Sequence, residues 1–169
     1  MQLHLVRHGN ATQSSQSATD FSRALSNIGI TEVESLATKI REQILLKKIF
    51  VDKIYHSGLL RAKETAEIIY KAVAIDNNDN NDDIDIEVCE ELSPDYGNYR
   101  YVIDKLINCS ENGGIMLVGH MPSLSKIGHY LLSDKIDLSF DTANMISLEW
   151  SRDDEEWKFL GKITPRDQI

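Results

Sequence analysis

Residues 3–10 read Leu-His-Leu-Val-Arg-His-Gly-Asn, and this stretch both suggests the fold and raises the question of function. The segment Leu3 to Val6 favours a short strand at the start of the chain. It runs directly into a cation, an imidazole and a glycine. We therefore expect Arg7 and His8 to lie at the carboxyl end of a first strand.

Strand-like and helix-like segments alternate along the rest of the chain. The expected strands are 3–6, 52–56, 84–89 (a possible edge strand), 115–118, 145–150 and 157–160. The expected helices run from a cap at Ser26 or Asn27 to about Lys47, over 60–73, over 99–108, and from Pro122 or just after it to 132. This alternation predicts an α/β fold, a three-layer α/β/α sandwich with a mainly parallel central sheet and a C-terminal β-hairpin. We expect one domain over residues 1–169.

Composition narrows the class of protein. Hydrophobic residues make up 41% of the chain and charged residues 27%, as in ordinary globular proteins. No apolar run approaches the roughly 18 residues of a membrane helix, and the N-terminus lacks a signal-peptide pattern. We therefore expect a cytoplasmic protein with no membrane partner. The net charge of -9, from 18 basic and 27 acidic residues, argues against nucleic acid as a partner.

Two other sequence features receive a plain structural interpretation. Cys89 and Cys109 form no CxxC pair, so we expect reduced, buried thiols rather than a disulfide or a zinc site. The polar stretch from Asp76 to Asp83 is typical of a solvated surface loop, because it lacks the glycine and terminal glutamate of a calcium loop.

The strongest functional signal is the set of residues that follow the expected strands. Arg7 and His8 follow the first strand, Arg61 lies one helical turn beyond the second, and His120 follows the central strand. Ligands of parallel α/β sheets bind beyond the carboxyl ends of the strands. We therefore expect these side chains to meet at one edge of the sheet.

These residue types favour an anionic substrate. Arginine presents a planar set of donors that matches phosphate or carboxylate oxygens, and an imidazole can act as a nucleophile. No carboxylates are grouped with them, so we expect neither a metal site nor a cofactor. The patterns GxSxG and GxxxxGK[ST] are absent. Phosphoryl transfer through a histidine nucleophile fits best, and Nε2 is the expected attacking nitrogen, with the other ring nitrogen donating to a backbone carbonyl.

Four ordered motifs carry a family resemblance. Val6-Arg7-His8-Gly9 resembles the RHG signature of the histidine phosphatase superfamily, the phosphoglycerate mutase-like proteins. Residues 22–26 (SRALS) resemble R-P-L-[ST], residues 57–65 (SGLLRAKET) resemble S-x-x-x-R-A-x-x-T, and residues 118–122 (VGHMP) resemble the second-histidine motif. The short chain looks most like the SixA-type phosphohistidine phosphatases.

The resemblance implies a role for each matching residue. His8 would be the nucleophile that forms a phosphohistidine intermediate. The residues implied to bind the phosphoryl oxygens and complete the pocket are Arg7, Arg23, Arg61 and His120. Such donors stabilise the charge on the equatorial oxygens, and each is worth about 10²–10³ in rate.

Three further residues carry weaker expectations. Gly9 would let the backbone approach the phosphate closely. Asn10 replaces the acidic residue or glutamine that is common after RHG, and we place it among the substrate-binding residues without a specific role. Glu91 lies in a stretch, residues 88–94 (VCEELSP), that resembles the E-L-[ST]-P of SixA-like proteins. It is either a general acid or a structural residue that braces the next loop.

The expected activity is hydrolysis of a phosphohistidine-bearing protein, such as a phosphotransfer domain. The first alternative is a phosphatase or mutase of the same superfamily that acts on a small phosphorylated substrate. The second is a catalytically silent module that binds phosphohistidine proteins.

Overall fold

The computed structural model describes residues 1–13, 19–74, 84–94, 96, 99–107, 113–133 and 138–166, and only the backbone of 106 and 107. The expected loop at 76–83 and Cys109 lie outside these residues. Cys89 is buried and free, as expected.

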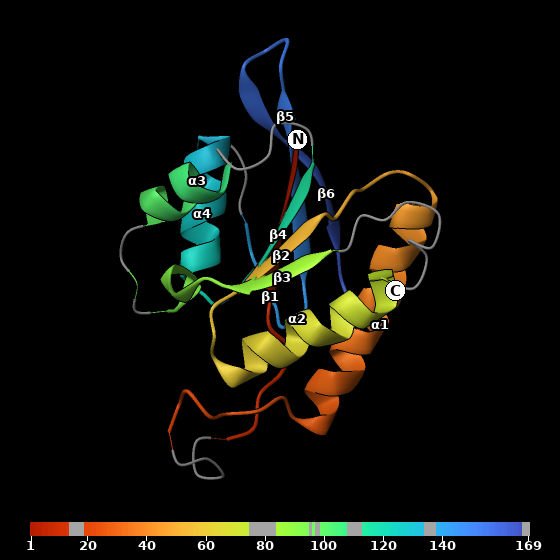
Figure 1. Cartoon of the computed structure of the whole chain (residues 1–169), viewed down its shortest axis with the longest axis vertical. Helices are drawn as coiled ribbons and strands as arrows, with labels where there is room; N and C mark the ends of the chain where they lie inside the picture. The colour runs from red at the N-terminus through yellow and green to blue at the C-terminus, as the bar shows by residue number, and fades with distance from the viewer. Residues whose placement is uncertain are drawn as a thin grey trace.

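The described chain folds around one six-stranded sheet (Figure 1). The strands are β1 (Gln2–Arg7), β2 (Lys53–His56), β3 (Asp85–Val88), β4 (Gly114–Gly119), β5 (Met145–Ser151) and β6 (Glu156–Ile163), and their order in the sheet is β3-β2-β4-β1-β5-β6. The first four strands pair in parallel, whereas β5 is antiparallel to β1 and forms a hairpin with β6. The predicted mainly parallel sheet, edge strand and C-terminal hairpin are confirmed.

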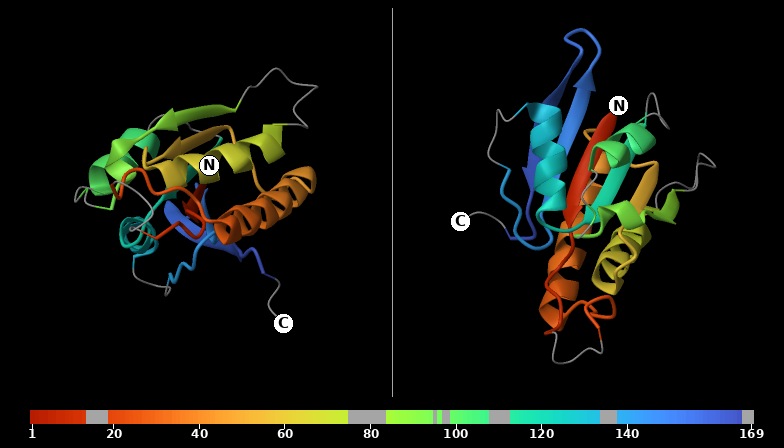
Figure 2. Two further views of the ribbon diagram at one scale, coloured as in Figure 1. Left: turned by 90° about the horizontal axis from the view of Figure 1, so that it is seen from below. Right: turned by 90° about the vertical axis from the view of Figure 1, so that its left-hand side faces the viewer.

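The helices cover both faces of this sheet (Figures 1 and 2). They are α1 (Asn27–Leu45), α2 (Leu60–Val73), α3 (Tyr99–Ile107) and α4 (Ser123–Leu132), with a short 3-10 turn, η3 (Glu90–Leu92), that was not expected. Helices α1 and α2 pack on one face, and α3 and α4 pack on the other. The three-layer α/β/α architecture is therefore confirmed.

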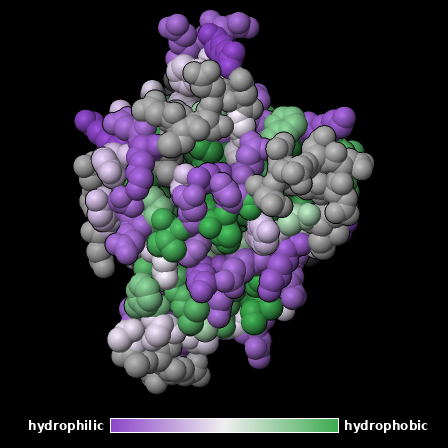
Figure 3. All heavy atoms as spheres, viewed as in Figure 1, coloured by the Kyte–Doolittle hydropathy of each residue, from purple (hydrophilic) through white to green (hydrophobic). Residues whose placement is uncertain are grey.

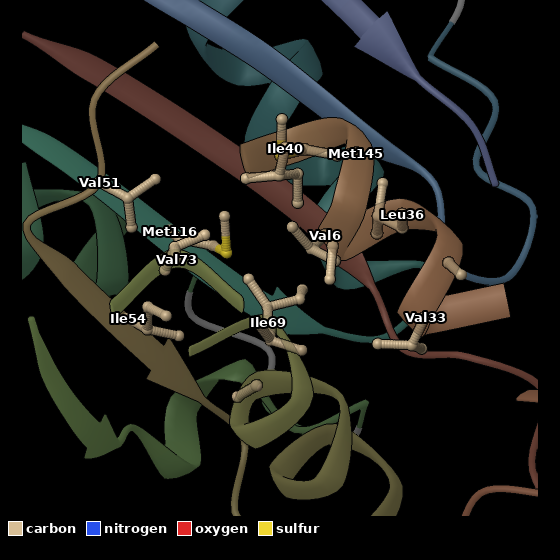
Figure 4. Packing of buried hydrophobic residues seen from close by; sticks show 14 of the residues in the cluster. Val6, Val33, Leu36, Ile40, Val51, Ile54, Ile69, Val73, Met116 and Met145 are labelled. Carbon is tan, nitrogen blue, oxygen red and sulfur yellow. The ribbon is translucent and has the colours of Figure 1, made fainter. Parts of the chain in front are cut away.

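Alternation along the central strands produces a separate apolar core on each face. Leu3 and Leu5 of β1 pack with α3 and α4, whereas Val6 packs with α1 and α2. Figure 4 shows the second cluster, in which Val6 and Met145 face α1 and Ile69 of α2 packs near Met116. A fully buried side chain of this size stabilises the fold by about 1.5–3 kcal/mol. Because β4 is buried on both faces, its sequence is an apolar run, whereas β1 alternates Leu3 and Leu5 with the buried polar residues Gln2 and His4.

The two ends of the sheet differ in character. In Figure 1, β1 runs downward from the N-terminus, and the segment that follows its carboxyl end continues into the lower part of the molecule. The β5–β6 turn projects from the opposite end, and hydrophilic side chains gather at its tip (Figure 3). No helix among the described residues is long and apolar enough to cross a membrane.

Candidate active site

His8 directly follows β1, and its backbone is held on both sides. Its amide donates to the Gly119 carbonyl at the end of β4 (3.2 Å), and its carbonyl accepts from the Ala143 amide (3.2 Å). The His8 Nδ1 atom lies 2.7 Å from the Gly9 carbonyl oxygen. A carbonyl can only accept, so Nδ1 carries the proton and Nε2 carries the lone pair. The expected attacking nitrogen is thus unprotonated, and its lone pair accepts from Arg61 Nε at 3.4 Å.

The environment of His8 keeps its ring neutral. Burial lowers the pKa of His8 to about 4, the Gly9 hydrogen bond opposes this shift, and the positive charges of Arg61, Arg7 and Arg23 lower it further. Near neutral pH the unprotonated Nε2 is therefore almost fully populated.

Three arginines from separate segments of the chain lie near His8. Arg7 ends β1 and donates from Nη1 to the Phe140 carbonyl (2.7 Å), while its buried Nε has no hydrogen-bond partner among the described residues. Arg61 lies in the first turn of α2, is buried, and directs Nε toward His8 Nε2 at 3.4 Å. Arg23 comes from the loop before α1, where its carbonyl accepts from the Arg61 amide (3.1 Å). An unpaired buried donor and two nearby guanidiniums form an arrangement suited to an oxyanion.

His120 follows β4 and faces the ring of His8, with the ring centroids 4.7 Å apart. Its Nε2 lies 2.7 Å from Ser57 Oγ at the end of β2. Burial lowers the pKa of His120 to about 3, and the charges of His8 and Arg61 contribute to the shift. Strand ends β1, β2 and β4 thus contribute to one constellation, as the sequence predicts.

These side chains line a cavity of about 300 Å³ at the carboxyl edge of the sheet. Its lining residues are Arg7, His8, Asn10, Ala11, Arg23, Arg61, Pro94, His120, Met121 and Thr142. None of these described lining residues carries a carboxyl group. Nor do the described parts of the chain contain a cluster of three or more His, Cys, Asp or Glu side chains able to hold a metal ion.

Glu91 does not reach this cavity. It lies in η3, where its Oε2 accepts from Cys89 Sγ (3.2 Å) and its Oε1 accepts from Lys105 Nζ (3.3 Å). Hydrogen bonds from its own backbone amide and from Cys89 lower the pKa of Glu91, and Lys105 lowers it further. Of the two interpretations of Glu91, the geometry favours the structural one, because an ionised carboxylate bound elsewhere cannot protonate a leaving group in the cavity.

The structure adds a packing constraint at Gly9. Its amide donates to Thr65 Oγ1 (3.2 Å), which in turn donates to the Arg61 carbonyl (2.7 Å). A Cβ on Gly9 would come within 2.7 Å of Val33 and 2.8 Å of the Gly29 carbonyl. Gly9 therefore allows close packing against α1, and the expected close approach to a phosphate stays a prediction.

Asn10 lines the cavity but also organises the start of α1. Its Oδ1 accepts from Ser26 Oγ (2.7 Å), and Ser26 Oγ accepts from the Gly29 amide (3.1 Å) as the N-cap of the helix. The Asn10 backbone amide donates to Glu32 Oε2 (3.1 Å). Asn10 thus ties the segment that carries His8 to α1.

Two contributing residues were not predicted. Thr65, although part of the quoted motif, had no expected role, and it joins the Gly9 amide to the helix turn that carries Arg61. Asp20 lies outside the quoted motifs, and its carboxylate accepts from both Arg23 and Arg61 at 3.0 Å. The only sequence signal was its position three residues before Arg23.

Known proteins share a sequence pattern and the fold with this chain. The family model of the histidine phosphatase superfamily (branch 1) matches residues 3–101. Among solved structures, the protein histidine phosphatase SixA in complex with tungstate superposes with a TM-score of 0.80 at 22% identity, over 98% of this chain and 97% of that one. A protein of Agrobacterium tumefaciens assigned as SixA gives 0.75 at 22% identity over 98% of both chains.

A phosphoglycerate mutase of Bacillus anthracis shares the fold as well, with a TM-score of 0.70 at 14% identity, over 94% of this chain and 91% of that one. No curated protein sequence matches the chain significantly. The family match runs from β1 to the start of α3 and so includes His8, Arg23 and Arg61. The chain belongs to the histidine phosphatase superfamily.

Proposed function

We propose that this phosphatase removes the phosphoryl group from phosphohistidine on a partner protein, with His8 as the nucleophile. The observation that carries the proposal is a cavity with two neutral histidines and three arginines but no carboxyl group among its described lining residues. The expulsion of an alkoxide requires a general acid. A phosphorylated imidazole can carry its own proton on the distal ring nitrogen and leaves as a neutral ring. Such a substrate needs no carboxylic acid in the pocket.

In the first step His8 Nε2 attacks phosphorus and the bond from phosphorus to the substrate nitrogen breaks. The substrate imidazole, protonated on its distal nitrogen, takes the electron pair and leaves neutral. The Nδ1 proton of His8 stays in place, and the Gly9 carbonyl 2.7 Å away stabilises the positive charge that forms on the phosphorylated ring. Arg7, Arg23 and Arg61 donate to the non-bridging oxygens during transfer.

In the second step water attacks the phosphohistidine. The bond between phosphorus and Nε2 breaks, His8 recovers its lone pair, and dihydrogen phosphate leaves. His120 completes the pocket as a neutral donor or acceptor held by Ser57. The histidine phosphatase SixA, whose fold this chain shares, was solved with tungstate, an oxyanion that resembles phosphate, and this supports an oxyanion site here.

Substrate competition tests the proposal. The probes are a histidine-containing protein phosphorylated by phosphoramidate, a phosphoserine peptide and 3-phosphoglycerate. We expect the highest kcat/KM for the phosphohistidine protein. Faster turnover of either of the other two would contradict the proposal and favour the small-molecule alternative.

A separate control addresses the silent-module alternative. His8→Ala should abolish phosphate release from the phosphohistidine protein while the fold is kept, as judged by circular dichroism. If the wild-type protein binds the phosphorylated partner but releases no phosphate from any probe, the chain is a binding module.

A further inference from the structure

Asp20 holds two of the arginines that line the cavity. Its carboxylate accepts from Arg23 Nη1 through Oδ1 and from Arg61 Nη2 through Oδ2, each at 3.0 Å. Its backbone carbonyl accepts from Arg61 Nη1 at 2.8 Å. One residue thus binds both terminal nitrogens of the Arg61 guanidinium.

These contacts fix the direction of the remaining Arg61 donor. A guanidinium is planar and rigid, so holding Nη1 and Nη2 sets where Nε points. In this structure Nε points toward His8 Nε2, 3.4 Å away, and the Arg61 side chain is only 6% exposed. The orientation of the donor that meets the attacking nitrogen is therefore set from outside the cavity.

The ion pair between Asp20 and Arg23 adds little to the stability of the fold. The two side chains are 59% and 25% exposed, and ion pairs of such exposure contribute on the order of 0–1 kcal/mol to folding. The negative charge of Asp20 also opposes binding of an anion by the same arginines. This carboxylate adds little stability through Arg23, and its charge repels the substrate. Its contribution therefore lies in the direction that it gives to the two guanidiniums.

We propose that Asp20 is a positioning residue that orients Arg61 and Arg23 toward the phosphoryl group during transfer to His8. This inference rests on the proposed function, because it requires His8 to be the nucleophile. A loss of structure would lower both the rate of phosphoryl transfer and the affinity for an anion. Removing the carboxylate should slow phosphoryl transfer but should not weaken anion binding.

The test uses phosphoramidate as phosphoryl donor and tungstate as anion. His8 Nε2 attacks the phosphorus of phosphoramidate, the phosphorus–nitrogen bond breaks, and ammonia leaves with a proton from solvent. The rate is followed by ³¹P NMR and the tungstate Kd by calorimetry. For Asp20→Asn we expect a rate about 10–100-fold lower, since misplacement of a catalytic group by about 1 Å costs up to 10²-fold. The tungstate Kd should stay equal or become tighter.

Two further variants tie the effect to Arg61. Asp20→Glu retains the charge and should recover part of the rate. In an Arg61→Lys background, Asp20→Asn should add less than its single-variant effect, because the group that it orients is already gone. The matched control is Asp154→Asn, which removes a half-exposed carboxylate paired with Lys158 at the far end of the sheet and should change neither value.

The outcomes separate this inference from the proposed function. A wild-type protein that phosphoramidate fails to phosphorylate would contradict both. If the wild type is phosphorylated, three results overturn only the inference: a wild-type rate for Asp20→Asn, a parallel loss of rate and tungstate affinity, or full additivity with Arg61→Lys.

Discussion

At the scale of single residues, the site depends on how His8 is held. The Gly9 carbonyl fixes the proton on Nδ1, and burial with three nearby arginines keeps the ring neutral. An imidazolium could not attack phosphorus. The same contacts therefore set both the direction and the protonation state of the nucleophile.

The titration of His8 tests this arrangement. In ¹H–¹⁵N spectra of the free protein we expect a ring protonated only on Nδ1 from pH 8 to about 5, with a midpoint near 4, because burial and the arginines disfavour the cation. The signal is assigned by its loss in His8→Ala. A midpoint near 6.5, or a proton on Nε2 in the neutral ring, would contradict the proposed geometry.

The residues that sequence patterns could not place share a physical reason. His8, Arg61 and His120 were predictable because each follows a strand whose end the topology brings to one edge. Asp20 and Glu91 lie in loops and a short turn, where side-chain direction depends on tertiary contacts. The Asp20 carboxylate reaches two arginines, whereas the Glu91 side chain turns to Cys89 and Lys105.

At the scale of elements, α1 is the support for the nucleophile segment. Gly29 in its first turn lies so close to this segment that a Cβ would stand 1.9 Å from the Asn10 carbonyl oxygen. Ser26 caps the same turn and binds Asn10. The helix and the segment after β1 therefore form one packed unit.

Replacement of Gly29 tests this contact. Gly29→Ala should force α1 away from residues 8–11, lower the free energy of unfolding by about 1–3 kcal/mol and reduce the rate of His8 phosphorylation. The matched control is Gly161→Ala in β6, where a Cβ would meet nothing within 4 Å. Urea unfolding and the phosphoramidate assay measure both effects. Equal behaviour of the two variants would show that the contact between α1 and the segment has no such role.

The ends of elements were predicted less well than their cores. The expected helix to about Lys47 ends at Leu45, and Lys47 takes a left-handed conformation (φ 54°) without the glycine that usually signals such an end. Strand β6 runs to Ile163, beyond the expected residue 160, because pairing of Met145 with Ile163 continues the ladder past Gly161. Pairing between strands far apart in the chain is not encoded in local periodicity.

At the scale of the whole molecule, buried histidines couple stability to pH. Burial lowers the pKa of His4 and His8 to about 4 and that of His120 to about 3. In the unfolded chain a histidine titrates near 6.5. Between about pH 6.5 and 4 the unfolded state therefore binds more protons than the folded state.

Stability should consequently fall as the pH is lowered through this range. Each such histidine contributes a slope of up to about 1.4 kcal/mol per pH unit to the free energy of unfolding. Urea denaturation at pH 7, 6 and 5 measures this slope. His4→Gln should make it shallower, since His4 is buried outside the cavity and bonded to Phe50 and Ser147. A free energy of unfolding that is constant from pH 7 to pH 5 would contradict the assignment of neutral buried rings.

The fold determines where the candidate site lies. The parallel strands β1, β2 and β4 end at one edge of the sheet, and the segments that contain Arg23 and Arg61 lie at the start of α1 and α2 beside it. The central claim is that the phosphoryl group passes through His8 Nε2. In the direct measurement the protein is mixed with a phosphohistidine protein and the reaction is quenched at alkaline pH. The phosphoryl group is then located by mass spectrometry and ³¹P NMR. We expect an acid-labile phosphoryl group on Nε2 of His8 that is absent from His8→Ala. No phosphoenzyme in the wild type during turnover, or the same label in His8→Ala, would contradict the claim.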